Sequence, residues 1–279
     1  MDPLPLVRDR DVRRHLLAPL AYRAGRQAFK ADYVASALHA ERRAGFLAEA
    51  VAALGPIPAL RLKGIAYVCG LYDDPALRPM TDIDLLVPAE AFAEARARLE
   101  GIGYRDDGKR NQRSPINHAV TLRRRESAID LHRSMVQVGR MALDLGAIWR
   151  DAIPAPQGTL RASPPHEYLI HVAHLARSEF LTALITYVDA DRLAAAAGPV
   201  DDLAGRWHLA RAERLVRRYV AALDRREMIH PFPFPSLAEL IAGQPAGRAR
   251  QVVRKLAVHD TPTDLVGFAW GAIRTRLGV

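Results

Sequence analysis

The sequence predicts a protein of the α+β or α/β class. We expect a small mixed β-sheet that is preceded by a pair of helices and followed by a helical bundle. Apolar residues recur at three- and four-residue steps at both ends of the chain, which is typical of amphipathic helices. Short alternating segments between residues 59 and 132 are typical of strands. Of the 279 residues, 49% are hydrophobic, which is enough to bury a substantial core. We expect three regions: helices at 1–55, the α/β core at 56–140 and a helical domain at 141–279.

The N-terminal pair of helices follows from apolar periodicity. The first is predicted from Asp11 to Gln27 and the second from Ala31 to Leu54. Gly55 and the prolines that follow end the second helix, because glycine caps helices and proline cannot continue them.

The α/β region is predicted from short strands that alternate with helices. Strands are expected at 59–62, 83–87, 116–124 and 128–132, with helices at 64–71 and 89–100. This order of elements, strand–helix–strand–helix–strand–strand, favours a small mixed sheet.

The sequence after Met141 is almost wholly helical in its pattern, and proline-rich breaks separate some of the segments. The predicted helices cover 164–177, 181–197, 201–224, 236–242, 246–258 and 264–277. We expect this region to supply the pocket for a second substrate.

Charge and cysteine content exclude several classes of protein. Forty basic and thirty-one acidic side chains leave a net charge of +9, spread along the chain, which favours solvated helices over a stripe that binds nucleic acid. A single cysteine, Cys69, excludes a disulfide framework and a cysteine-built zinc site. No secretory leader and no apolar run of about 18 residues are visible, so we expect a soluble, cytoplasmic protein without membrane contact.

The carboxylates near the predicted strands are the most informative feature. Asp82 and Asp84 are two apart, so they share one face of a strand while Ile83 faces the core. Asp130 and His132 repeat the pattern on another strand. If the strands are neighbours, three carboxylates meet and can hold one or two Mg²⁺ ions, which favours phosphoryl transfer. The alternative is a solvated strand start with unremarkable acids.

The pair Lys63-Gly64 follows a short strand and begins a predicted helix. Backbone N–H groups at a helix start attract anions, and glycine lets a phosphate approach closely. Lys63 would add a point charge for a triphosphate, although the pair is also compatible with a plain turn. Arg78, in the loop before Asp82, either clamps phosphates or forms a structural ion pair.

Together these motifs resemble the nucleotidyltransferase superfamily, and within it the branch labelled uncharacterised nucleotidyltransferase. The stretches that carry the resemblance are Lys63-Gly64, Leu71-Tyr72, Asp74-Pro75, Leu77-Arg78-Pro79-Met80, Asp82-Ile83-Asp84-Leu85-Leu86-Val87 and Ile129-Asp130-Leu131-His132. The resemblance implies a polymerase-β-like palm. It implies that Asp82 and Asp84 are the paired metal ligands and Asp130 the third carboxylate. Lys63-Gly64 replaces the Gly-Ser pair that is usual in the superfamily, so the hydroxyl of that serine is absent.

Three further residues are candidates for the acceptor side of such a site. His118 and His132 lie on the predicted strands at 116–124 and 128–132, and Asp189 lies on a predicted helix. A structural role is the alternative for His118. Asp189 and Asp191 cannot form a matched metal pair, because residues two apart on a helix point in roughly opposite directions.

We therefore predict a Mg²⁺-dependent nucleotidyltransferase that holds two ions at Asp82, Asp84 and Asp130. It would move an NMP, with AMP preferred, from an NTP to a hydroxyl, phosphate or amine of a small molecule or peptide, and release pyrophosphate. Lys63, Gly64 and Arg78 would orient the phosphates. Two alternatives stay open: a toxin-like nucleotidyltransferase directed at tRNA, and a non-catalytic palm that binds RNA or a protein partner.

Overall fold

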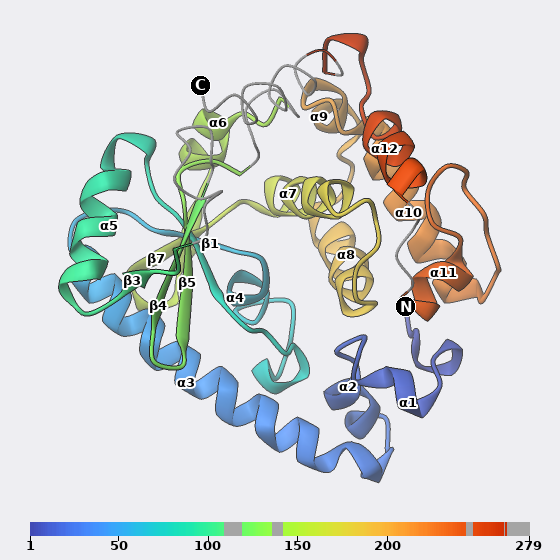
Figure 1. The fold of residues 1–279 in the computed structure, drawn as a ribbon, viewed down its shortest axis with the longest axis horizontal. Coiled ribbons are helices and arrows are strands. Elements are labelled where there is room, and N and C mark those ends of the chain that lie inside the picture. The colour runs from blue at the N-terminus through green and yellow to red at the C-terminus, as the bar shows by residue number, and fades with distance from the viewer. Residues whose placement is uncertain (109–118, 136–141, 244–247, 265, 267–279) are drawn as a thin grey trace. The chain divides into compact units, whose positions relative to one another are not determined.

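The structure is a computed structural model that describes residues 1–108, 119–135, 142–243, 248–264 and 266 (Figure 1). Contacts divide the chain into two compact units. The first comprises Met1–Val34 and Pro164–Val266, and Ala35–Ser163 belong to the second.

The second unit is built on a seven-stranded mixed sheet, which confirms the predicted fold class (Figure 1). Its strands are β1 (Leu60–Leu62), β2 (Ile83–Leu86), β3 (Arg105–Asp106), β4 (Ala119–Arg124), β5 (Ser127–His132), β6 (Ile153–Ala155) and β7 (Thr159–Arg161). The order across the sheet is β3-β4-β5-β2-β1-β7-β6. The pairs β2–β5 and β1–β7 are parallel and the others are antiparallel.

Four helices accompany this sheet. They are α3 (Lys30–Leu54), α4 (Lys63–Tyr67), α5 (Phe92–Gly101) and α6 (Leu145–Arg150). The core forms where α3 and α5 contribute apolar side chains against one face of the strands, with Leu47 and Leu99 among the fully buried residues. Ile83 and Leu85 face this core, as the alternation of β2 predicts. Asp84, between them, therefore faces the opposite side of the sheet.

Strands β3, β6 and β7 are not predicted from the sequence; β6 lies at the proline-rich break at 154–156 and β7 in the segment between this break and the helix predicted from 164. Each has two or three residues, too few for periodicity to show. Pro154 is tolerated in β6 because this is an edge strand, where a missing N–H breaks no central ladder. Strand β7 exists through parallel pairing with β1, a contact between segments about a hundred residues apart.

The first unit is helical. Its helices are α1 (Asp9–Val12), α2 (Ala18–Arg23), α7 (Pro164–Arg177), α8 (Ile185–Ala197), α9 (Asp201–Arg206), α10 (Ala210–Arg225), α11 (Leu237–Ala242) and α12 (Arg248–Ala257). Short 3₁₀ helices cover Leu4–Leu6 and Gln27–Phe29 in this unit, and Pro75–Leu77, Ala89–Ala91 and Pro156–Gly158 in the other. Across the described ranges, no helix has the length and apolarity that a membrane span requires.

Two predicted helices are each interrupted by a residue in left-handed backbone conformation. Leu16, with φ of 57°, separates α1 from α2, and His208, with φ of 55°, separates α9 from α10. An α-helix cannot continue through such a residue. The predictions of single helices at 11–27 and 201–224 were therefore wrong. Most of the helix predicted at 264–277 lies outside the described residues.

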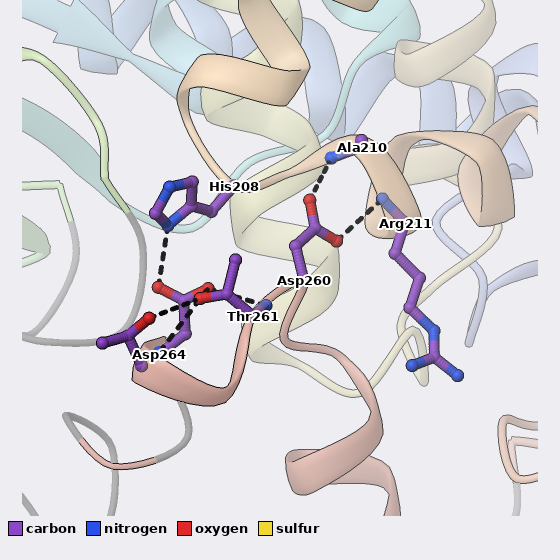
Figure 2. Close-up of polar contacts among 7 residues, drawn as sticks. His208, Ala210, Arg211, Asp260, Thr261 and Asp264 are labelled. Atoms are coloured by element: carbon purple, nitrogen blue, oxygen red, sulfur yellow. Dashed lines mark hydrogen bonds and ion pairs between the residues drawn. The ribbon is translucent and has the colours of Figure 1, made fainter.

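The break before α10 is stabilised from another segment of the first unit (Figure 2). The Asp260 carboxylate accepts hydrogen bonds from the backbone N–H groups of Ala210 and Arg211, at 2.7 and 2.9 Å. It thereby caps donors that the helix cannot satisfy itself. Nearby, His208 Nδ1 lies 2.8 Å from Asp264 Oδ1, so two carboxylates hold the turn between α9 and α10.

Candidate functional site

The candidate site is built where β1, β2 and β5 lie side by side. In the parallel pairing of β2 with β5, Asp84 and Asp130 are directly opposite each other. In the antiparallel pairing of β1 with β2, Leu62 is opposite Asp84, so the chain that follows β1 begins beside the same carboxylate. Side chains at paired positions lie on the same face of a sheet. The register therefore gathers Asp84, Asp130 and the Lys63-Gly64 step.

Asp84, Asp130 and His132 form a compact group of potential metal ligands. One ligand atom from each lies within 4.8 Å of the others. His132 Nε2 is 2.9 Å from Asp84 Oδ1, and both side chains are buried, whereas Asp130 is half-buried. Solvent therefore reaches the group at Asp130, whereas Asp84 and His132 are shielded from it.

Lys63 contacts the same carboxylate. Its Nζ lies 2.5 Å from Asp84 Oδ1. Lys63 has a φ of 52°, a left-handed conformation that a residue with a side chain rarely adopts. Such a conformation costs on the order of 1–3 kcal/mol and persists only where the surrounding structure enforces it. The turn from β1 into α4 therefore holds the ammonium group against Asp84 at the expense of backbone strain.

The pKa of Asp84 lies below the ordinary value of an aspartate. Burial by itself raises this pKa, but the hydrogen bond and charge of His132 and the ammonium of Lys63 outweigh the effect of burial. Asp84 is therefore ionised at neutral pH and available as a ligand.

Asp82 has the opposite shift. It lies immediately before β2 and is half-buried. Burial raises its pKa, and so do the charges of Asp84 and Asp130, while Lys63 partly offsets the increase. Asp82 thus experiences the electrostatic field of the whole group, and a cation between these carboxylates would relieve their repulsion.

Gly64 and Arg78 lie beside one another at the start of α4. A Cβ placed on Gly64 would be 3.2 Å from the Cβ of Met80 and 3.9 Å from the Nη1 of Arg78. The loop that contains Met80 thus packs closely against Gly64. The Arg78 side chain is buried and donates to the Pro79 carbonyl at 2.5 Å.

The other two predicted site residues are not brought to this group by any described contact. His118 lies outside the described residues. Asp189 is completely buried on α8, in the other unit. Asp191, two positions further along α8, is half-exposed and accepts a hydrogen bond from the N-terminal ammonium of Met1 at 2.9 Å.

Two cavities lie along α3 in the unit that contains the sheet. The larger, about 530 Å³, is mainly apolar and is lined by residues that include Ala40, Ala44, Leu47, Ile65, Val68 and Met80. The smaller, about 280 Å³, is lined by charged and polar residues that include His39, Arg42, Arg43, Glu126 and Ser127. The two sets of α3 residues are offset along the chain, so two different stripes of one helix face the two cavities.

Arg43 lies near this group without any signal in the sequence that indicates it. The amphipathic pattern of α3 indicates a helix, but it does not reveal which of its many charged residues lies near Asp82. In the structure, burial lowers the pKa of Arg43 while the charge of Asp82 raises it. No sequence signal finds this pair, because it depends on how α3 packs against the sheet.

The donor set of the group fits a divalent cation. Asp84 and Asp130 supply carboxylate oxygens, which Mg²⁺ and Ca²⁺ prefer, and His132 supplies a nitrogen that transition metals accept. The elevated pKa of Asp82 indicates a further carboxylate that gains from a nearby positive charge.

Among the comparisons with known proteins, the match to a family model agrees with the motifs. No curated protein matches the chain in sequence. Among solved structures, the antibiotic-resistance factor ANT(2'')-Ia shares 14% identity, with a TM-score of 0.38 over 70% of this chain and 94% of that one. The sequence profile described as "Uncharacterised nucleotidyltransferase" matches residues 10–225, which include the whole carboxylate group. Because this match covers most of the chain, the protein belongs to the uncharacterised nucleotidyltransferase family.

Proposed function

We propose that the protein is a Mg²⁺-dependent enzyme that transfers a nucleoside monophosphate, with AMP preferred, from an NTP to an acceptor. The observation that carries this proposal is the register of β2 and β5, which pairs Asp84 with Asp130 on the face opposite the core. Family membership supports the reaction class.

In this proposal Asp82, Asp84 and Asp130 hold the metal. Bound Mg²⁺ supplies a positive charge that neutralises the phosphate oxygens of the NTP and of the departing pyrophosphate. A nucleophilic oxygen or nitrogen of the acceptor forms a bond to the α-phosphorus, the proton that a hydroxyl or amine nucleophile carries is released to solvent, and the bond from that phosphorus to the bridging oxygen breaks. Pyrophosphate leaves with the electron pair of that bond.

Lys63 has two roles in this proposal. In the structure it neutralises Asp84 at a contact of 2.5 Å. With a cation held at Asp84, the Lys63 ammonium would be free to contact the phosphates of the NTP. The close packing of Gly64 against Met80 keeps this turn compact, and Arg78 would add a guanidinium on the same side.

His132 would position Asp84. Its Nε2 contacts the same oxygen that Lys63 contacts, so the imidazole helps to determine the orientation of the carboxylate. A hydrogen bond of this kind holds a metal ligand in place. Asp189 and His118 remain predictions for the acceptor side, as does the assignment of the acceptor as a small molecule or peptide.

The test is a calorimetric titration of the full chain with ATP, GTP, CTP and UTP, each with Mg²⁺ and with EDTA. We expect Mg²⁺-dependent binding of one nucleotide, lost in Asp84→Asn and retained in Asp202→Asn, which changes an exposed carboxylate on α9. Nucleotide binding that is equally tight in Asp84→Asn would refute the site. Salt-dependent RNA binding without any nucleotide binding would favour the non-catalytic alternative.

A further inference from the structure

We propose that the smaller cavity, between α3 and the beginning of β5, binds an oxyanion on the acceptor, either a phosphoryl or a carboxylate group. This inference rests on the proposed function, because it assigns the cavity to the second substrate. The cavity measures about 280 Å³, and the side chains that define its chemistry are His39, Arg42, Arg43, Glu126 and Ser127. That volume is suitable for one charged group and the part of a small molecule attached to it.

Basic side chains dominate one stripe of α3. His39, Arg42 and Arg43 are three and four positions apart, so they lie on one face of the helix. Phe46, one turn further on, continues this stripe with an apolar side chain. A ligand in the cavity therefore meets cationic groups from α3 and an apolar wall behind them.

Arg43 is a cationic residue of this cavity whose side chain would be stabilised by a bound anion. Its side chain is half-buried, and its Nη1 donates to the His39 carbonyl oxygen at 3.3 Å. Among the residues that the structure describes, no carboxylate lies within ion-pair distance of this guanidinium. A guanidinium has five N–H donors in a planar fork, and partial burial of an unpaired charge is unfavourable. A phosphoryl or carboxylate group bound in bidentate fashion would accept hydrogen bonds from the guanidinium and balance its charge.

Arg42 forms an ion pair that an anionic ligand can replace. Its Nη1 lies 3.0 Å from Glu126, and both side chains are exposed. Exposed pairs of this kind contribute little free energy, so an incoming oxyanion can compete with Glu126 for Arg42. Glu126 thus lowers the affinity of the cavity for anions without closing it.

The cavity lies on the α3 face of the sheet, opposite the face that carries Asp84 and Asp130, and the member of the carboxylate group near it is Asp82. Ile83, which lines the cavity, directly follows Asp82, and the charge of Asp82 acts on Arg43. An oxyanion bound at Arg43 would therefore anchor its molecule near Asp82, at the end of the sheet where β2 and β5 begin, and the rest of the acceptor would extend past Asp82 toward the face that carries Asp84 and Asp130. This neighbourhood suits an acceptor, whose nucleophile must approach the α-phosphorus.

The arrangement of the sheet separates this cavity from the residues assigned to the phosphates of the NTP. Lys63 and Gly64 follow β1, whereas Ser127 and Ala128 begin β5. In the sheet, β1 and β5 lie on opposite sides of β2. The NTP would thus bind on the β1 side of the carboxylates and the acceptor on the β5 side.

The test is calorimetric titration of the full-length protein with inorganic phosphate, and separately with acetate, in EDTA at constant ionic strength. We expect saturable binding of at least one anion, weakened by about tenfold or more in Arg43→Gln, because a bidentate charged contact is lost. Arg150→Gln changes an exposed arginine of the same unit and should bind as the original protein does. The phosphate and acetate titrations distinguish phosphoryl from carboxylate acceptors.

Glu126→Gln provides a test in the opposite direction. It frees Arg42 without removing a cation, so phosphate should bind more tightly, by up to about fivefold. This variant keeps the inference testable if Arg43→Gln fails to fold, as a thermal melt would show. Unchanged binding in Arg43→Gln, or weaker binding in Glu126→Gln, would overturn the inference.

A final titration, with phosphate at saturating Mg²⁺ and a non-hydrolysable NTP analogue, separates the two substrates. Unchanged phosphate binding supports an acceptor subsite, and competition between the two overturns that assignment. If phosphate binding depends on Arg43 but no nucleotide binds at all, the anion site is confirmed and the proposed transferase function fails. If nucleotide binds and phosphate does not, the function stands and the subsite is refuted.

Discussion

Asp84 of β2 and Asp130 of β5 occupy directly opposite positions of a parallel strand pair, so their carboxylates lie on the same face of the sheet. Ile83 and Ile129, which directly precede these aspartates, face the other way and belong to the buried hydrophobic cluster. The apolar side of the sheet therefore determines which face the carboxylates occupy. A shift of either strand by one residue would bury an aspartate in this core.

A divalent cation should stabilise the protein through this pair. We expect Mg²⁺ or Mn²⁺ to raise the melting temperature of the original protein, with a gain of about 2.7 kcal/mol when the free metal is a hundred times its Kd. Asp84→Asn and Asp130→Asn should each lose most of this gain, and Asp202→Asn should keep it. A thermal melt with and without metal measures the effect, and equal gains in all four proteins would contradict the assignment.

Asp82→Asn and Asp84→Asn should have opposite effects on stability without metal at pH 7. The folded-state pKa of Asp82 is raised, so its charged form destabilises the fold above the ordinary aspartate pKa of about 3.9. The pKa of Asp84 is lowered, so its charged form stabilises the fold in that range. We therefore expect the free energy of unfolding to rise in the first variant and fall in the second.

Urea denaturation at pH 7 and pH 3.5 checks this pair of predictions. The stabilisation in Asp82→Asn should shrink as the pH falls through the raised pKa of Asp82, because the original protein then becomes neutral at this position. Effects of the same sign in the two variants would show that the electrostatic description of the group is wrong.

The free-energy cost of the left-handed backbone conformation at Lys63 should be measurable by comparing two substitutions that both remove the ammonium. Lys63→Gly adopts a φ of 52° without strain, whereas Lys63→Ala does not. Glycine should therefore be the more stable variant by about 1 kcal/mol, although glycine usually destabilises helical positions. Chemical denaturation of the two variants gives the difference, and a more stable alanine variant would mean that the turn rearranges.

Asp264 should make the helical unit sensitive to acid (Figure 2). Hydrogen bonds from Thr261 and His208 lower its pKa despite the opposing effect of burial. The contribution of the ionised Asp264 to the free energy of unfolding is fully present above the ordinary aspartate pKa. It is lost as the pH falls through the lowered pKa of the folded state. Asp264→Asn should therefore reduce the pH dependence of the free energy of unfolding below about pH 4.

Asp9→Asn is the matched control for Asp264. The Asp9 carboxylate is largely exposed and pairs with Arg26 at 3.0 Å on the protein surface. Because exposed ion pairs contribute little to stability, the pH dependence of the free energy of unfolding should be unchanged in this variant. A pH profile in Asp264→Asn identical to that of the original protein would refute the role of Asp264.

Local patterns in the sequence were enough to predict the strands that carry the carboxylates. The alternation of apolar and acidic residues at 82–87 and 128–132 indicates strands with one buried face, and the structure has β2 and β5 there. Helices α7 and α11 follow the predicted bounds because proline, serine and glycine residues delimit them locally. The family resemblance, confirmed by the profile match, depends on the same short motifs.

Local sequence patterns could not predict the contacts between segments that are distant in the chain. Strand β7 exists only because it pairs with β1, and the left-handed residues Leu16 and His208 interrupt helices whose apolar periodicity continues through them. The position of Arg43 near Asp82 depends on the packing of α3 against the sheet.

The sequence by itself therefore determined the family and the strands that hold the candidate carboxylates, since strand alternation and local motifs are properties of neighbours in the chain. The tertiary structure alone decided that Lys63 and His132 meet at one oxygen of Asp84, and that Arg43 comes close enough to Asp82 for their charges to interact. The physical reason is that charge interactions act over a few ångströms in space, whatever the separation along the chain.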